Sequence, residues 1–132
     1  MPPRIHSFDH VHVFVADREA SERWYAEVLG FTRTEELAFW APGGGPLTVQ
    51  NADGTVHLAL FERPCQECRS TIALRVGADE FRQWRQHLDN VLGSRAVLED
   101  HEVSWSLYFD DLDGNPFEIT TYEVEAAKRS LP

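Results

Sequence analysis

The sequence lacks the features that define several protein classes. Its only two cysteines, Cys65 and Cys68, form a single CxxC. Without a second CxxC this pair is a weak indication of a metal or redox site, so we expect reduced thiols in a loop. No apolar run approaches the roughly 18 residues that a membrane span needs. The N-terminus lacks the charged head and apolar stretch of a signal peptide, and a cytoplasmic protein is therefore expected.

Positive charge is also scarce. Twelve Lys and Arg residues stand against twenty-two Asp and Glu residues, which gives a net charge of −10. A negative field repels phosphate backbones, so the composition argues against nucleic-acid binding. The same field favours metal ions or cationic small molecules as ligands.

Material for a core is present, because 42% of the residues are apolar and 11% are aromatic. A chain of 132 residues is too short for two independent cores. We therefore predict one domain over residues 1–132.

The first half of the chain has the pattern of one strand, one helix and three further strands. Alternation over residues 8–15 places His10 and His12 on one face of the first strand and three valines on the other. Asp17 suits a helix N-cap and Gly30 suits the residue after the helix. The further strands are predicted at 31–40, 47–50 and 56–61, with a loop at 42–46.

The second half repeats this order after about 61 residues. It predicts a strand at 72–76, a helix at 79–92 and strands at 95–98, 104–109 and 117–122. Module one is thus expected at 7–62, a linker at 63–70, module two at 71–122 and a short polar tail, for which a helix is one option, at 123–132.

A single βαβββ module of about 60 residues is marginal on its own. Two modules side by side share a core and enclose a cavity into which the front faces of the strands point. The predicted fold class is therefore α+β, with two tandem βαβββ modules forming a curled mixed sheet around a cavity.

Two segments resemble a known family. FDHVHVFVADREASERWYAEVLGF, at residues 8–31, is similar to the opening signature of the vicinal-oxygen-chelate superfamily. SLYFDDLDGNPFEI, at residues 106–119, resembles the closing strand of the same superfamily. Its members include glyoxalase I, extradiol ring-cleaving dioxygenases, fosfomycin-resistance enzymes and bleomycin-binding proteins. The motifs indicate the fold more strongly than the reaction.

The resemblance implies a divalent ion held by the first and last strands of each module. His10 and Glu118 stand at two of the ligand positions, and imidazole with carboxylate suits Fe, Mn, Ni or Zn. Thr71 stands at the third position, where the family has histidine, and its hydroxyl is a poor ligand for these metals. The alternatives are a packed histidine at position 10 and a buried carboxylate with another partner at position 118.

The fourth ligand position depends on how the two modules are aligned. His57 lies 61 residues before Glu118, as His10 lies 61 residues before Thr71, and this alignment makes His57 a ligand. Aligning the two Asp-Gly turns instead sets Leu58 opposite Glu118 and turns His57 to the outer face.

Two further residues resemble catalytic groups of the ring-cleaving members. Tyr108 lies ten residues before Glu118, at the spacing of a substrate-binding tyrosine. His101 stands in a stretch similar to one whose histidine assists proton transfer, although Glu102 replaces the usual glycine and a differently shaped loop is expected. A phenol and an imidazole would suit deprotonation of a catechol. A core tyrosine and an exposed loop histidine are the alternatives.

These observations predict a metal-dependent enzyme that acts on a small oxygen-bearing substrate, either ring-cleaving or glyoxalase-like. The closing motif favours the ring-cleaving branch. The resemblance also implies a homodimer. The alternative is a metal-free protein that sequesters a cationic small molecule, since aromatic faces attract cations and the chain holds four tryptophans.

Overall fold

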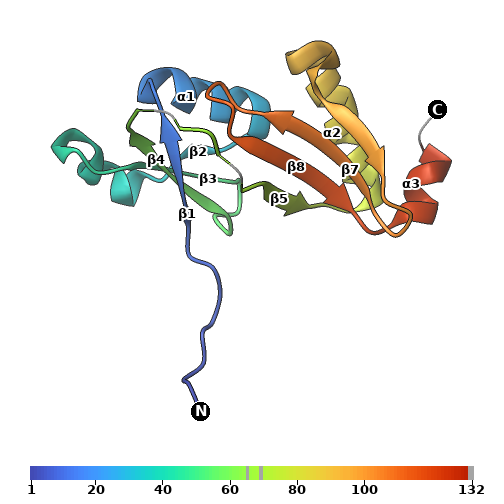
Figure 1. Cartoon of the computed structure of the whole chain (residues 1–132), viewed down its shortest axis with the longest axis horizontal. Helices are drawn as coiled ribbons and strands as arrows, with labels where there is room; N and C mark the ends of the chain where they lie inside the picture. Colours follow the sequence, from blue (N-terminus) through green and yellow to red (C-terminus); the bar gives the residue numbers. More distant parts are fainter. Residues whose placement is uncertain (65, 69, 131–132) are drawn as a thin grey trace. The chain divides into compact units, whose positions relative to one another are not determined.

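The computed structural model describes residues 1–64, 66–68 and 70–130. The chain divides into two compact units, Met1–Cys65 and Gln66–Pro132. Both units have a four-stranded mixed sheet with helices on it, so the chain is an α+β protein of two tandem modules (Figure 1).

In unit one the strands lie in the order β1-β4-β3-β2. The outer pair β1 and β4 is parallel, and the other neighbours are antiparallel. These strands are β1 (Val11–Val15), β2 (Thr32–Arg33), β3 (Leu47–Gln50) and β4 (His57–Glu62). Helix α1 (Arg18–Trp24) continues into the π-helix η1 (Tyr25–Leu29), and the 3-10 helix η2 spans Glu35–Gly43.

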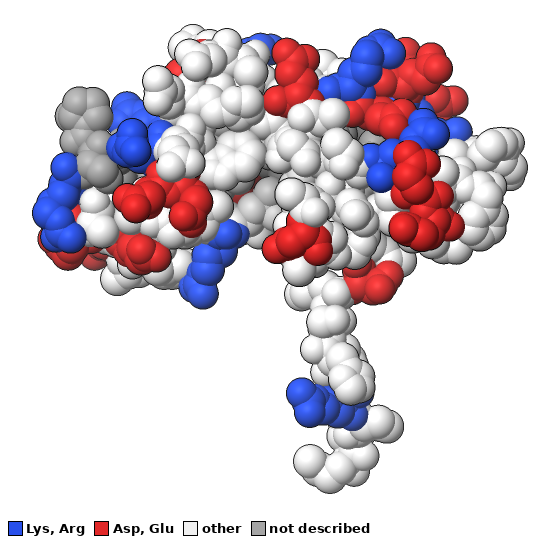
Figure 2. Space-filling model, turned by 180° about the vertical axis from the view of Figure 1, so that it is seen from behind, with Lys and Arg blue, Asp and Glu red and all other residues white. Residues whose placement is uncertain are grey.

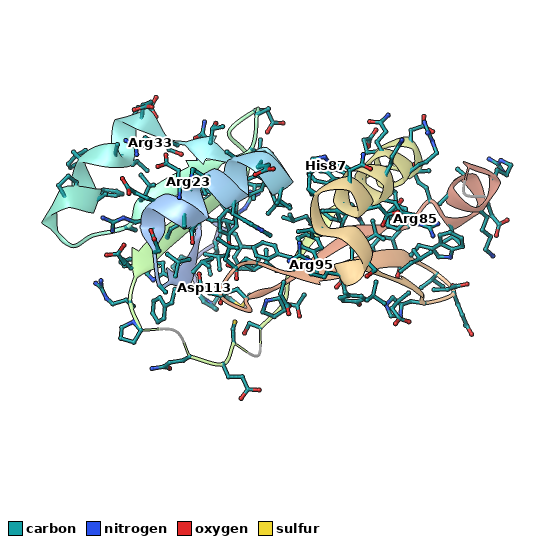
Figure 3. The ribbon with its side chains drawn as sticks, turned by 90° about the horizontal axis from the view of Figure 1, so that it is seen from above. Arg23, Arg33, Arg85, His87, Arg95 and Asp113 are labelled. Atoms are coloured by element: carbon teal, nitrogen blue, oxygen red, sulfur yellow. The ribbon has the colours of Figure 1, made fainter. Side chains whose placement is uncertain are left out.

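The helical segment of unit one begins and ends at the residues predicted from the sequence. The Asp17 carboxylate accepts a hydrogen bond from the Ala20 N–H at 3.1 Å, which caps α1. Gly30 ends the segment with φ +71°, a left-handed conformation that glycine adopts without a steric penalty. Arg33 of β2 binds both carboxylate oxygens of Glu22 on α1 at 2.9 Å, and this hydrogen bonding raises the pKa of Arg33 (Figure 3).

The strand predicted at 31–40 is wrong. Only Thr32 and Arg33 pair with β3, and the chain then turns into η2. The Leu37 N–H donates to the Thr34 carbonyl at 3.0 Å, which closes the first helical turn. The next residues are Glu, Glu, Leu and Ala, which favour helical conformations and do not alternate as a strand requires.

In unit two the strands lie in the order β5-β8-β7-β6, with β5 and β8 parallel. The strands are β5 (Ile72–Arg75), β6 (Val97–Asp100), β7 (Trp105–Asp110) and β8 (Pro116–Thr121). Helix α2 (Ala78–Leu92) is followed by the 3-10 helix η3 (Gly93–Arg95) and, after β8, by α3 (Val124–Ser130). The order therefore repeats that of unit one, as the sequence pattern predicts.

Two predicted boundaries in unit two change. The strand predicted at 95–98 begins at Val97, because the Arg95 side chain donates to the Leu92 carbonyl at 2.7 Å and residues 93–95 extend the helix. The tail is not simply polar. Val124 and Ala127 of α3 are buried, and α3 packs on α2.

Each sheet has an apolar face that is buried under its helices. In unit one the residues of this face include Val13, Val15, Leu58 and Leu60. In unit two the buried apolar residues of the sheet and of α2 include Phe81, Leu88, Leu107, Phe109, Phe117 and Ile119. Because side chains alternate along a strand, the residues between these apolar positions point to the opposite face. No helix in the described part of the chain is long and apolar enough to cross a membrane.

Candidate functional site

Unit one gathers histidines on the open face of its sheet. His10 directly precedes β1, His12 lies within it, and His57 begins β4. His10 and His57 line the same cavity of about 130 Å³. The other lining residues are Asp9, Leu37, Trp40, Pro46, Thr48 and Ala59. Of the three predicted ligands, His10 and His57 thus lie together in unit one, and Glu118 belongs to unit two.

The pairing of strands corrects the alignment of the two modules. In β1 and β4, His12 pairs with Ala59, and in β5 and β8, Ala73 pairs with Glu118. Since His12 precedes Ala73 by 61 residues, the position equivalent to Glu118 is Ala59, and neither His57 nor Leu58 occupies it. His57 differs from Ala59 by two residues and therefore keeps the same face, beside His10. The outward-facing alternative for His57 is wrong, because it lines the cavity and Leu58 is buried.

The His10 imidazole contacts the carboxylate of the preceding residue, Asp9. Its Nδ1 lies 2.7 Å from the Asp9 carboxylate, with 41% of the His10 side chain exposed. An ionised carboxylate only accepts hydrogen bonds, so the tautomer that suits this contact carries its proton on Nδ1 and its lone pair on Nε2. A carboxylate on one ring nitrogen is the usual arrangement behind a metal-binding imidazole. The donor chemistry at His10 therefore fits a divalent transition ion.

Unit two carries a polar network on the face of its sheet opposite the apolar one. The Ser106 hydroxyl donates to the Glu118 carboxylate at 2.6 Å and lies 3.0 Å from the Thr120 hydroxyl. Ser106 is fully buried, and Glu118 is half-buried. A hydrogen bond to a charged group contributes roughly 1.5–3 kcal/mol, which offsets the cost of partly burying the carboxylate. Ser106 thus holds Glu118 in one orientation.

Tyr108 lies beside Glu118 in this network. The two residues are paired across β7 and β8, and the His101 Nε2 lies 3.0 Å from the Tyr108 hydroxyl. Partial burial and then the negative charge of Glu118 raise the pKa of Tyr108, so the phenol keeps its proton at neutral pH. The two predicted catalytic residues therefore touch, and a carboxylate lies next to them.

A tight turn presents His101 to Tyr108. The His101 N–H donates to the Ser104 carbonyl at 2.9 Å, and the Glu102 N–H donates to the Asp100 carboxylate at 2.8 Å. Glu102 has φ +69°, the left-handed conformation that glycine adopts most readily. Glu102 therefore adopts a backbone conformation that glycine favours, at the position where the similar stretch has glycine.

Other predicted positions contribute no donor. Thr71 is exposed just before β5, and the β5 residue across from Glu118 is Ala73. Among the described residues, no group of three or more His, Cys, Asp and Glu side chains converges on one point. Cys68 is exposed, and Cys65 lies outside the described residues.

Sequence reasoning missed Asp9 and Ser106. Asp9 directly precedes His10, so the sequence alone could have predicted a carboxylate that contacts this candidate ligand. Ser106 could have been found from strand alternation, because it lies two residues before Tyr108 and so shares its face.

Negative charge is spread and not concentrated at one place on the visible surface. Figure 2 shows Asp and Glu side chains interspersed with Lys and Arg. The net charge of −10 therefore gives little reason to favour a cationic ligand at a particular point on this face.

Comparisons with known proteins agree with this architecture. The family model described as the Glyoxalase/Bleomycin resistance protein/Dioxygenase superfamily matches residues 7–119. The search of curated proteins yields no match.

Several solved structures share the fold. A protein from Bacillus anthracis assigned to the glyoxalase family has a TM-score of 0.72 at 19% identity, over 92% of this chain and 99% of that one. A glyoxalase/dioxygenase from Nostoc punctiforme has a TM-score of 0.63 at 19% identity, over 86% and 88%. A mutant of the fosfomycin resistance protein FosX from Listeria monocytogenes has a TM-score of 0.70 at 15% identity, over 96% and 99%. That FosX structure is a complex with Mn(II) and 1S,2S-dihydroxypropylphosphonic acid. At these identities the likeness establishes the fold.

The contact between Glu118 and Tyr108 predicts a measurable pKa change. Replacing Glu118→Gln removes the negative charge that disfavours tyrosinate, so the pKa of Tyr108 should fall toward its ordinary value of about 10. It should stay somewhat elevated because burial, the larger cause, remains. The measurement is the ultraviolet absorbance of tyrosinate against pH, with Tyr108→Phe identifying the Tyr108 signal.

The matched control is Asp113→Asn, which removes one charge from the β7–β8 turn of the same unit (Figure 3). It should leave the pKa of Tyr108 unchanged. An unchanged or higher pKa in Glu118→Gln would show that the carboxylate does not act on the phenol.

Proposed function

Because this chain belongs to the glyoxalase/bleomycin resistance protein/dioxygenase superfamily, we propose that it is a metal-dependent enzyme acting on a small oxygen-bearing substrate. The observation that carries the proposal is the contact between the Tyr108 hydroxyl and the His101 imidazole beside Glu118. A protonated phenol joined to an imidazole is a route for moving a proton, and a protein that only stores a ligand does not need one.

The proposed metal ligands are His10, His57 and Glu118. The Asp9 contact supports His10, because it leaves Nε2 free to bind an ion. The shared cavity supports His57 as a second imidazole. The assignment of Glu118 to the same ion comes from the sequence resemblance and stays a prediction. A bound divalent ion would act as a Lewis acid toward the substrate oxygens.

The protein's own residues have separable tasks in this proposal. Tyr108 keeps its hydroxyl proton at neutral pH, since partial burial and Glu118 raise its pKa, and it can pass that proton to His101 as it accepts one from a substrate oxygen. His101 is exposed and within 3.0 Å of the Tyr108 hydroxyl, so it can exchange a proton with water. Ser106 orients the Glu118 carboxylate and is a positioning residue. The phenol and imidazole favour deprotonation of a catechol-like substrate, and we therefore propose the ring-cleaving branch.

Metal retention tests the proposed ligands. His10→Ala and Glu118→Ala should each abolish retention of the ion with the fold intact, and His57→Ala should weaken metal affinity more than about tenfold. The measurement is elemental analysis after dialysis against Mn(II), Fe(II), Ni(II) or Zn(II), with circular dichroism as the check of folding. His87→Ala on α2 is the control and should retain the ion (Figure 3). Full retention in any one variant would remove that residue from the ligand set.

Turnover tests the catalytic pair. Protein loaded with Fe(II) should consume oxygen in the presence of catechols. Tyr108→Phe and His101→Ala should each lower the rate roughly 100-fold or more, because each removes a proton-transfer group. Tyr122→Phe is a matched control, since Tyr122 is exposed and stacks on Arg75.

The outcomes separate two failures. Oxygen uptake that is unchanged in Tyr108→Phe would remove the phenol from the mechanism. Absence of uptake with every catechol would contradict the ring-cleaving proposal and direct the search to glyoxalase-type substrates.

A further inference from the structure

His12 lies beside His10 on the open face of β1. The Nε2 atoms of the two rings are 3.0 Å apart, and the rings are nearly parallel, with an angle of 21° and centroids 5.0 Å apart. Residues two apart on a strand point to the same face, so this proximity follows from the His-Val-His sequence at positions 10–12. Neither the predicted ligand set nor the predicted catalytic pair includes His12.

The spacing of the nitrogens suits two ligands of one ion. With Nδ1 of His10 protonated against Asp9, Nε2 of His10 presents a lone pair to Nε2 of His12. Two ring nitrogens this close either share a proton in an N–H···N hydrogen bond or bind one cation that lies off the line between them. Nitrogen ligands lie about 2.0–2.1 Å from a bound transition ion, so neighbouring ligands are separated by about 3 Å. The observed distance of 3.0 Å is compatible with both arrangements.

His12 is an exposed residue whose ring also contacts an aromatic side chain. Its centroid lies 4.6 Å from that of Phe61 with an angle of 51° between the rings, and Phe61 in turn packs edge-on against Phe14 with centroids 6.2 Å apart. These contacts limit the orientations that the His12 ring can adopt before an ion binds.

The strand register shows that His12 stands next to a position that has no donor atom. His12 pairs with Ala59, which occupies the position equivalent to Glu118 and carries no donor atom. Thr71, at the position of the superfamily's usual second histidine, is a poor donor as well. Two of the four repeat-related positions are thus without a good ligand, and an additional imidazole stands directly across from one of them.

We propose that His10 and His12 form a bidentate chelate for a divalent transition ion, with Asp9 orienting His10. Imidazole donors suit Ni(II), Cu(II) and Zn(II). This inference rests on the proposed function, because both require His10 to bind the ion. It goes beyond it in adding His12 to the proposed ligands His10, His57 and Glu118. The competing account is a direct N–H···N hydrogen bond that serves only the packing of the strand.

Calorimetric titration of the full chain with Zn(II) and with Ni(II) tests the chelate. His12→Phe keeps an aromatic ring against Phe61 and removes both nitrogens, and it should weaken affinity roughly tenfold or more. The matched control is His87→Phe, since His87 also packs against an aromatic ring, with its centroid 5.5 Å from that of Trp84 on α2. The control should bind as the unmodified protein does.

A second measurement does not depend on a variant that folds. In the unmodified protein, long-range ¹⁵N–¹H spectra of the histidine side chains should show Nε2 of both His10 and His12 changing on addition of Zn(II). Nδ1 of His10 should remain protonated. A change confined to His10 would overturn the chelate.

The outcomes distinguish this inference from the proposed function. Unchanged affinity in His12→Phe, with binding lost in His10→Ala and Glu118→Ala, would overturn the chelate and leave the proposed function standing. Binding lost in His10→Ala and His12→Phe but kept in Glu118→Ala would support the chelate and remove Glu118 from the ligand set. Absence of binding by the unmodified protein would overturn both.

Discussion

The register between β1 and β4 is the constraint on which the candidate chemistry of unit one depends. With Val11 paired to Leu58, the residues Val13, Val15, Leu58 and Leu60 are buried, and His10, His12 and His57 lie on the opposite face. A shift of one residue would exchange the two sets. It would bury imidazoles without partners and expose four aliphatic side chains, at a cost of about 1.5–3 kcal/mol for each lost burial. The apolar core therefore fixes the position of the polar face.

Unit two has the same strand order but carries a carboxylate and a phenol where unit one carries histidines. A carboxylate at Glu118 and a phenol at Tyr108 share a strand pair, where the negative charge and partial burial make ionisation of the phenol unfavourable. Ser106 supplies a hydrogen bond to the carboxylate from a buried position, and His101 contacts the phenol from an exposed turn. The network is thus ordered at its buried end and open to water at the other. That arrangement suits proton exchange with a ligand on this face.

Much of this organisation can be predicted from the sequence, and the reasons are local. Alternation at 8–15 identifies both faces of β1, and Asp17 and Gly30 delimit the helical segment because capping depends on neighbouring residues alone. The approach of His101 to Tyr108 is consistent with the predicted catalytic pair. Pairing between distant strands is harder to predict. The two-residue difference between the modules moves the equivalent of Glu118 from His57 to Ala59, and no local pattern reveals it. Likewise, residues 35–43 become helical because pairing ends at Arg33, which depends on the partner strand.

The proposed catalysis requires that these donor groups hold a divalent metal ion. Its most direct test is the metal content of untagged protein purified anaerobically without chelators. We expect close to one transition ion per chain, and the identity of the ion would then narrow the reaction, with iron favouring catechols and nickel or zinc favouring glyoxalase-type chemistry. Protein that contains no metal, and takes up none on reconstitution with Mn(II), Fe(II), Ni(II) or Zn(II), would contradict metal-dependent catalysis.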